Sequence, residues 1–328
     1  TPDAPSSIRA IGALPAVCGF LGVGASLVLD WAHALRHSLR HALKKRLRTV
    51  LYGVLIGAGL MELGLTYADL RVWSAHSEVY WLYKTHFYEI ARFLDDPPPT
   101  VPSPVEDAVV FESWVDPIDV DGVRRNLAHD ARVPRWTQQG RAFVWPAASS
   151  RFVIAVPVFT TVGEEIWERT MVDARQVATG AYRMPNGKPG VVFYLASREP
   201  TLSDTLDAVR DLPADVPGRE GAGSVQRPVD FGGQVRFHGY DILDADGDTL
   251  SLLTLWEVTS ELSTPLKIFI HLLDHENELV SQYDGLDVWL PETRSGDHFI
   301  QIHSMPYPDG CESGCGLQLG LYNPYTLD

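Results

Sequence analysis

The stretch HALRHSLRHALKKRLR, residues 33–48, holds the densest group of side chains that could do chemistry. His33, His37 and His41 stand four residues apart, so a helix would place three imidazoles on one face, where they could hold a metal ion. Six lysines and arginines among them would equally suit nucleic acid or anionic lipid headgroups. We expect contact with lipid headgroups, because no carboxylate or cysteine nearby completes a set of metal ligands.

Apolar segments flank this basic stretch on both sides. Residues 11–29 carry no charge, and residues 49–67 carry only Glu62. Each is close to the roughly 20 apolar residues that cross a bilayer as a helix. We therefore predict two transmembrane helices joined by a basic cytoplasmic loop, residues 30–48. A cleaved signal peptide over residues 11–29 is the alternative.

This topology predicts a multi-pass protein of the cell membrane, with membrane lipid as a partner and the C-terminal domains outside the cytoplasm. Glu62 is then a candidate functional carboxylate within the membrane. The chain begins with threonine, and we expect it to be part of a longer polypeptide.

Charge is distributed unevenly along the 328 residues, whose formal net charge is −15. Residues 1–48 hold seven lysines and arginines against two aspartates, which leaves 20 basic and 40 acidic side chains in the remainder. Such an acidic region disfavours nucleic acid as a partner.

The region after the second apolar segment divides into five parts. We predict an interfacial helix (68–94), a proline-rich linker (95–104), an extracytoplasmic α/β module (105–198), a second linker (199–228) and a β-sandwich of jelly-roll type (229–328). The first helix could instead be an amphipathic helix that packs on the next domain. The sequence DADGD, residues 244–248, is expected to be a hairpin turn rather than a calcium loop, since the spacing lacks the glycine and glutamate that an EF-hand needs.

The chain has three cysteines, of which Cys311 and Cys315 lie in the glycine-rich sequence DGCESGCG. Outside the cytoplasm they could close one small disulfide loop. Two cysteines alone do not complete a zinc site, so we predict no metal here.

Two stretches near the C-terminus carry a family resemblance. KIFIHLLDHENELVSQYDG, residues 267–285, and GLQLGLYNP, residues 316–324, are similar to the C-terminal β-sandwich of certain bacterial multi-spanning glycosyltransferases. These belong to the C-type superfamily, which includes protein O-mannosyltransferases and the aminoarabinose transferases of lipid A. The order of Tyr67, Trp73, Glu78 and EIARFLDD upstream also resembles these enzymes.

The resemblance implies an inverting enzyme that moves a sugar from a polyprenyl-phosphate donor to an extracytoplasmic glycan or protein acceptor. The family's catalytic carboxylate is expected upstream of Thr1, so no catalytic residue is assigned and this segment alone is expected to be inactive. The resemblance implies no cofactor in this segment and leaves a divalent metal open for the full enzyme. The alternative function is a membrane-anchored carbohydrate-binding or adhesion module without catalysis.

Sugar sites combine an aromatic surface with planar polar groups, and the sandwich offers both. The sequence alternates so that Phe269, His271 and Leu273 share one face of a strand. His271 would also suit a hydrogen-bonded core position, and Gln282 and Asp284 would also suit the end of a strand. The candidate carbohydrate contacts are Trp256, His271, Gln282, Asp284 and Trp289, with Tyr283 beside them.

Overall fold

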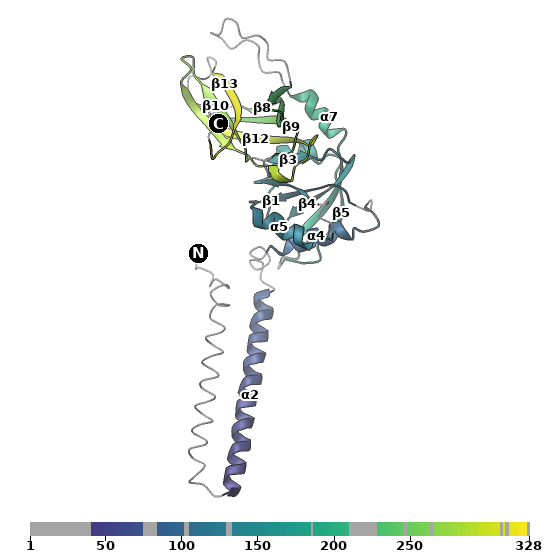
Figure 1. The fold of residues 1–328 in the computed structure, drawn as a ribbon, viewed down its shortest axis with the longest axis vertical. Coiled ribbons are helices and arrows are strands. Elements are labelled where there is room, and N and C mark those ends of the chain that lie inside the picture. The colour runs from purple at the N-terminus through teal and green to yellow at the C-terminus, as the bar shows by residue number, and fades with distance from the viewer. Residues whose placement is uncertain are drawn as a thin grey trace. The chain divides into compact units, whose positions relative to one another are not determined.

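The computed structural model describes residues 41–74, 84–101, 105–128, 133–184, 186–209, 228–245, 248–262, 265–308, 311 and 315–326. The chain forms two compact units, Thr1–Ser74 and Ala75–Asp328. Within the described residues the protein consists mostly of β-sheets, with three sheets and five α-helices (Figure 1).

The described part of the first unit is one long helix, α2 (His41–Ser74). It begins inside the predicted basic loop and continues through the predicted second span. The prediction of two transmembrane helices is wrong as a description of this fold, because no helix among the described residues is both long enough and apolar enough to cross a bilayer. Glu62 is a charged residue of α2 within the predicted span. The other predicted span, 11–29, and residues 33–40 of the basic stretch lie outside the described residues.

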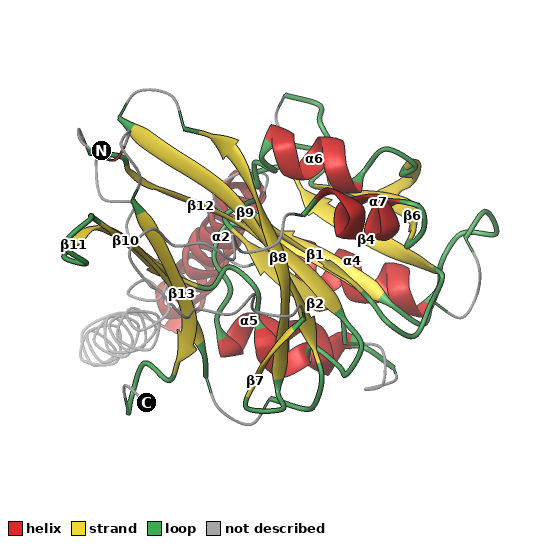
Figure 2. Cartoon of the chain, turned by 90° about the horizontal axis from the view of Figure 1, so that it is seen from above, coloured by secondary structure: helices red, strands yellow, loops and turns green. Residues whose placement is uncertain are grey.

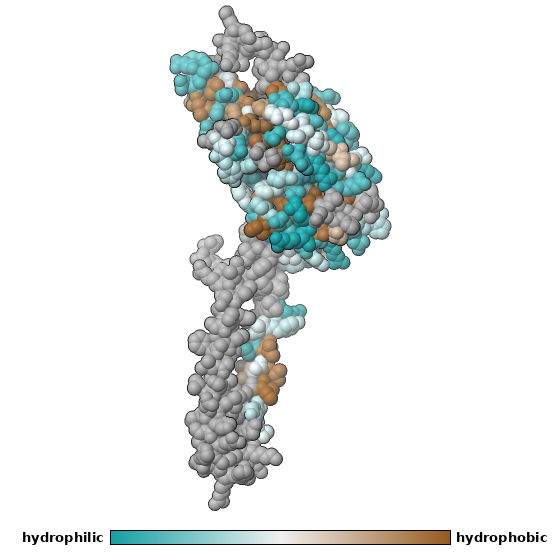
Figure 3. Space-filling model, in the orientation of Figure 1, coloured by the Kyte–Doolittle hydropathy of each residue, from teal (hydrophilic) through white to brown (hydrophobic). Residues whose placement is uncertain are grey.

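Apolar side chains of α2 are nevertheless exposed. Val54, Ile56, Leu60 and Leu63 are each more than 60% exposed, and Figure 3 shows apolar side chains gathered along the described part of this helix.

The next described helix, α4 (Thr85–Asp95), overlaps the C-terminal part of the predicted interfacial helix. Its buried face includes Phe87, Ile90 and Leu94, which join one hydrophobic cluster with residues of the following sheet. Along Thr85–Asp95 the chain therefore forms an amphipathic helix packed on its own domain.

A mixed five-stranded sheet follows, with the strand order β2-β1-β4-β6-β5. Strand β1 pairs in parallel with β2 and β4, whereas β6 is antiparallel to both β4 and β5. Helices α4 and α5 contribute to the cluster on one face, and α6 and α7 to the cluster on the other (Figure 2). The bounds are β1 (Ala108–Glu112), β2 (Arg135–Gln138), β4 (Arg151–Pro157), β5 (Arg175–Thr179), β6 (Val191–Ser197), α5 (Pro117–Asn126), α6 (Glu164–Thr170) and α7 (Thr201–Ala208).

Local sequence explains where α5 begins. The Asp116 carboxylate accepts hydrogen bonds from the backbone N–H groups of Ile118 and Asp119, and the Asp119 carboxylate accepts one from the Asp116 N–H. This reciprocal cap and the proline at the first helical turn fix the start of the helix. Helix α7, by contrast, lies within the segment predicted as the second linker.

Sandwich-like sheets occupy the C-terminal region. A five-stranded antiparallel sheet has the order β3-β12-β9-β8-β7, and a three-stranded antiparallel sheet has the order β11-β10-β13. Between them lies a cluster that includes Trp256, Ile270 and Phe299. The bounds are β3 (Ala142–Trp145), β7 (Val229–Phe231), β8 (Val235–Asp244), β9 (Thr249–Val258), β10 (Lys267–Leu273), β11 (Leu279–Gly285), β12 (His298–Pro306) and β13 (Gly316–Tyr322), with a 3-10 turn η3 (Leu290–Glu292).

Strand β3 ties the two layers together. It comes from the segment predicted as the α/β module, yet it is an edge strand of the five-stranded sandwich sheet, where Phe143 lies opposite Ile300. The other face of that sheet therefore packs on the α/β layer, in a cluster shared by Phe111, Leu255 and Ile300.

A fully buried ionic cluster also joins the layers. Arg135 of β2 donates from Nε to Asp297 at 2.8 Å and also forms an ion pair with Asp107. Asp297 in addition accepts from the backbone N–H groups of Ala147 and Arg294, both at 2.8 Å. Burial alone would lower the pKa of Arg135, but hydrogen bonds and charges from Asp297 and Asp107 outweigh burial and raise that pKa. The guanidinium therefore stays charged and paired.

Replacing Arg135 with methionine should destabilise the protein by about 3–5 kcal/mol, because two carboxylates would stay buried without their partner. Urea unfolding of the full chain measures this change. Arg175→Met, at an exposed position of β5, is the matched control and should change stability by less than about 0.5 kcal/mol. An equal effect of the two substitutions would contradict a central role for the cluster.

Candidate functional site

One side of the three-stranded sheet faces away from the sandwich core and gathers aromatic and polar side chains. Strand alternation sends Ile268, Ile270 and Leu272 inward, where each is at most 3% exposed. The residues between them point to the opposite side. We call that side the outer face, and define it by Lys267, Phe269 and His271 of β10, Gln282 and Asp284 of β11, and Gln318, Gly320 and Tyr322 of β13.

Strand register brings these residues into rows. His271 lies between Gln282 and Gln318, its partners on the two neighbouring strands. Phe269 lies in the same way between Asp284 and Gly320. Residues directly opposite in a sheet contact each other, so the register builds one continuous surface.

The aromatic part of the outer face centres on Phe269. Its ring lies 4.7 Å from the His271 ring and 6.3 Å from the Tyr322 ring, measured between centroids. A Cβ atom at Gly320 would lie only 2.5 Å from the Phe269 ring, so the ring rests directly on the backbone of β13. Glycine at position 320 therefore leaves room for the phenyl ring.

Polar groups surround this aromatic centre. Gln282, Asp284 and Gln318 are exposed, while Phe269, His271 and Tyr322 are half-buried. Desolvation, and after it the charge of Asp284, raises the pKa of Tyr322. Tyr322 therefore keeps its hydroxyl proton and can donate a hydrogen bond at neutral pH.

The structure brings together three of the residues predicted to contact sugar and separates the others. His271, Gln282 and Asp284 share the outer face. Trp256 is fully buried between the sheets, where its indole N–H donates to Thr254 Oγ1 at 2.8 Å. Trp289 packs against the cluster of the α/β layer, so neither tryptophan belongs to this face. Phe269, Gln318 and Tyr322 also lie on the outer face. Alternation within a strand predicts which face each of these side chains takes, but only the pairing between strands shows that they lie close together.

Glu62, the other predicted functional carboxylate, is exposed on α2 in the first unit. Among the described residues nothing assigns it a role.

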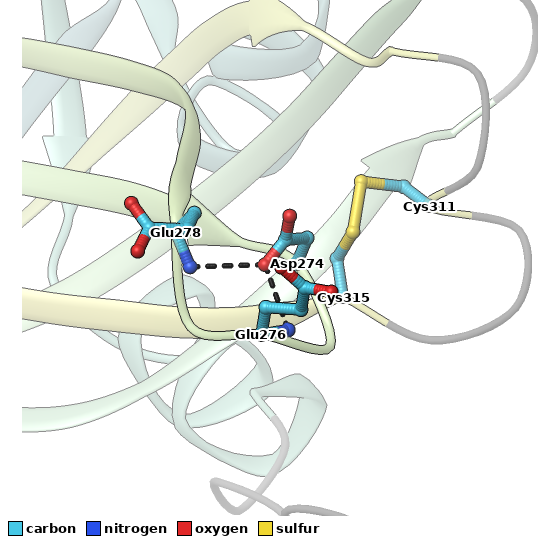
Figure 4. Close-up of a disulfide and its surroundings, with 5 residues drawn as sticks. All are labelled: Asp274, Glu276, Glu278, Cys311 and Cys315. Carbon is cyan, nitrogen blue, oxygen red and sulfur yellow. Dashed lines mark hydrogen bonds between the residues drawn. A yellow bond between two sulfur atoms is a disulfide. The ribbon is translucent and has the colours of Figure 1, made fainter.

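A disulfide closes the loop before β13. Cys311 and Cys315 are bridged, and Figure 4 shows the bond beside the turn that joins β10 to β11. In that turn the Asp274 carboxylate accepts from the N–H groups of Glu276 at 2.8 Å and Glu278 at 2.9 Å. Since Leu273 pairs with Gly316, this turn and the disulfide together define one end of the outer face.

A buried carboxylate, Glu112, lies at the carboxyl end of β1 beside a histidine and a lysine. Glu112 Oε2 lies 2.7 Å from His86 Nε2, both side chains are inaccessible to solvent, and Lys84 lies 3.6 Å from Glu112 Oε1. Lys84 also pairs with Asp119 at 3.4 Å. Such groups suit acid–base chemistry, but the complete burial of His86 and Glu112 favours a role in holding α4 against the sheet.

Three further side chains could hold a metal ion. His238, Glu257 and His298 lie together on the five-stranded sandwich sheet. The sequence alone does not predict this group, because the three residues are far apart along the chain and meet only through the pairing of three strands.

A polar group lies inside the sandwich, behind the outer face. Asp287 is 2% exposed, and burial raises its pKa to about 6 although Arg141 and Tyr283 oppose this shift. The same burial is the main cause that raises the pKa of Tyr283 to about 12. His303, which contacts Thr254 at 2.8 Å, is buried in its neutral form, and desolvation lowers its pKa to about 3.

Asp287→Asn should raise stability at pH 7.5 by about 2–3 kcal/mol, because the pKa of the aspartate is higher in the folded protein than in the unfolded chain. A raised carboxyl pKa means that the folded state binds the proton more tightly. The destabilisation caused by the buried Asp287 carboxylate is therefore absent below about pH 4, grows between about pH 4 and 6, and is complete above about pH 6.

Urea unfolding of wild type and Asp287→Asn at several pH values measures this difference, with the exposed Asp173→Asn as control. The titration of His303 affects all three proteins alike. A difference in unfolding free energy between wild type and Asp287→Asn that stays the same at every pH would contradict the raised pKa of Asp287.

Comparison of the chain with protein-family models, with curated proteins and with solved structures finds no match in any of the three.

Proposed function

We propose that the outer face of the three-stranded sheet binds carbohydrate. The observation that carries this proposal is the half-buried Phe269 ring packed directly on Gly320, with amide side chains on both flanking strands. A sugar ring has an apolar face of C–H groups that packs on an aromatic ring, and a rim of hydroxyl groups that both donate and accept hydrogen bonds.

The polar residues match that rim. Gln282 and Gln318 each offer a carbonyl oxygen and an amide N–H₂ group, so they pair with hydroxyls in either direction. Asp284 accepts hydrogen bonds, and the protonated Tyr322 hydroxyl donates one. The outer face holds one lysine and one aspartate, and the chain is strongly acidic, so a neutral sugar fits better than an anionic one.

The disulfide supports an extracytoplasmic location, where disulfides form and persist and where glycans are exposed. A binding module of this kind needs no catalytic residue of its own. It would equally serve a polyprenyl-phosphate-sugar glycosyltransferase that must hold an acceptor glycan, which is the function that the family resemblance implies. That transferase function stays a prediction from the resemblance.

Phe269→Ala should weaken binding of an oligosaccharide by the full chain by about five- to tenfold, since loss of the stacking surface removes roughly 1–1.5 kcal/mol. A panel of immobilised neutral and acidic glycans identifies the ligand, and titration calorimetry then measures the affinity. Gln318→Ala should weaken binding by a smaller factor, because it removes hydrogen bonds but keeps the platform.

Trp114→Ala is the matched control, because Trp114 is a 61% exposed aromatic residue of the α/β layer. It should bind as wild type does, which excludes non-specific adhesion through exposed aromatic rings. The proposal fails if wild type binds no glycan of the panel, or if Phe269→Ala and Trp114→Ala have equal effects.

A further inference from the structure

Two histidines and a glutamate meet on the five-stranded sandwich sheet, on the face opposite the sandwich interior. His238 comes from β8, Glu257 from β9 and His298 from β12, which are neighbouring strands. One nitrogen or oxygen atom from each side chain lies within 4.8 Å of the others. Each residue is partly exposed, so an ion from solvent can reach the group.

Strand pairing explains why these three side chains converge. Glu257 lies directly opposite His298 on one side and opposite Arg236 on the other. The β8–β9 register shifts between Phe237 and Gly239, which makes His238 the extra residue of a β-bulge. Gly239 has a φ of 147°, a conformation that favours glycine. The bulge directs His238 towards Glu257, so that its Nε2 lies 3.1 Å from Glu257 Oε2.

The second histidine has the hydrogen bond that commonly orients a metal ligand. His298 Nδ1 lies 3.0 Å from the carbonyl oxygen of Gly296. When Nδ1–H donates to that carbonyl, the ring is fixed in the tautomer whose Nε2 carries a lone pair. The ring centroids of His238 and His298 are 5.3 Å apart, which suits two imidazoles that share one ion.

From this geometry we propose that His238, Glu257 and His298 form a binding site for one divalent transition-metal ion, with Zn²⁺ as the best-fitting ion. Two imidazole nitrogens and one carboxylate oxygen suit Zn²⁺, whereas Ca²⁺ and Mg²⁺ prefer oxygen ligands alone. Three protein ligands leave the fourth tetrahedral position for water or an anion. Binding draws the ligand atoms inward to about 2.0–2.2 Å from the ion.

Two arginines limit the affinity of this site. Arg236 pairs with Glu257 Oε2 at 3.0 Å, and Arg198 Nη2 lies 3.3 Å from His298 Nδ1. Arg236 therefore competes with the metal for the carboxylate. Removal of Arg236 should strengthen metal binding, whereas a purely structural role of this ion pair would predict no gain in metal affinity.

Titration calorimetry of the chelator-treated full chain with zinc chloride tests the proposal. Wild type should bind Zn²⁺ at this site, His238→Ala should reduce the affinity at least about tenfold, and Arg236→Gln should increase it. Zn²⁺ should also raise the thermal midpoint of wild type but not that of His238→Ala, because an ion that binds only the folded state stabilises it. Glu257→Gln is a second ligand variant if His238→Ala does not fold.

Two histidine variants serve as controls. His275 is 82% exposed in the turn between β10 and β11, so His275→Ala should bind zinc as wild type does. His37→Ala tests the three histidines of the basic stretch as a separate source of zinc affinity. The proposal is overturned if wild type binds no zinc, if His238→Ala and Glu257→Gln bind it unchanged, or if His37→Ala alone abolishes binding.

Discussion

The guanidinium of Arg135, enclosed with Asp107 and Asp297, is the interaction on which the described domain depends. A buried charge is tolerable only when it is paired and hydrogen-bonded. Here one cation from β2 is held by an aspartate that precedes β1 and by another that precedes β12. Arg135 and Asp107 belong to the α/β layer, so the bond from Arg135 to Asp297 is the one that fixes the sandwich to that layer. Strand β3 strengthens this connection. It lies among the strands of the α/β layer along the sequence, but it pairs with β12 in the five-stranded sandwich sheet.

The outer face uses the rigidity that this arrangement provides. The three-stranded sheet buries alternate residues against Trp256 and Phe299, and those residues belong to strands whose other face packs on the α/β layer. The inward side chains set the pleat of β10, and the pleat turns Phe269 and His271 outward. The absence of a side chain at Gly320 then leaves room for the Phe269 ring. A stacking platform on a packed sheet needs little ordering when a ligand binds, which favours affinity.

The strands of the sandwich could be predicted from the sequence because β8 to β13 alternate apolar and polar residues or form apolar runs between clear turns. Three predicted sugar contacts lie on one face for the same reason. The pairings of His271 with Gln318 and of Phe269 with Gly320 could not be predicted, since no local pattern specifies which strands become neighbours. Strands β2 and β3 were missed because four residues each are too short to show a period, although they carry Arg135 and the connection between layers. The transmembrane prediction rested on the apolar run 49–67 alone, whereas the described helix α2 extends beyond that run at both ends and is not long and apolar enough to cross a bilayer.

Hydrogen exchange of the full chain, with and without the tightest-binding oligosaccharide of the panel, tests the central claim most directly. Strands β11 and β13 form the two edges of the sheet that carries the outer face. The bound sugar should therefore slow amide hydrogen exchange in residues 279–285 and 316–322 and leave exchange in residues 108–112 of β1 unchanged. Slower exchange confined to the α/β layer or to α2 would show that the sugar binds elsewhere and would contradict the assignment of the outer face.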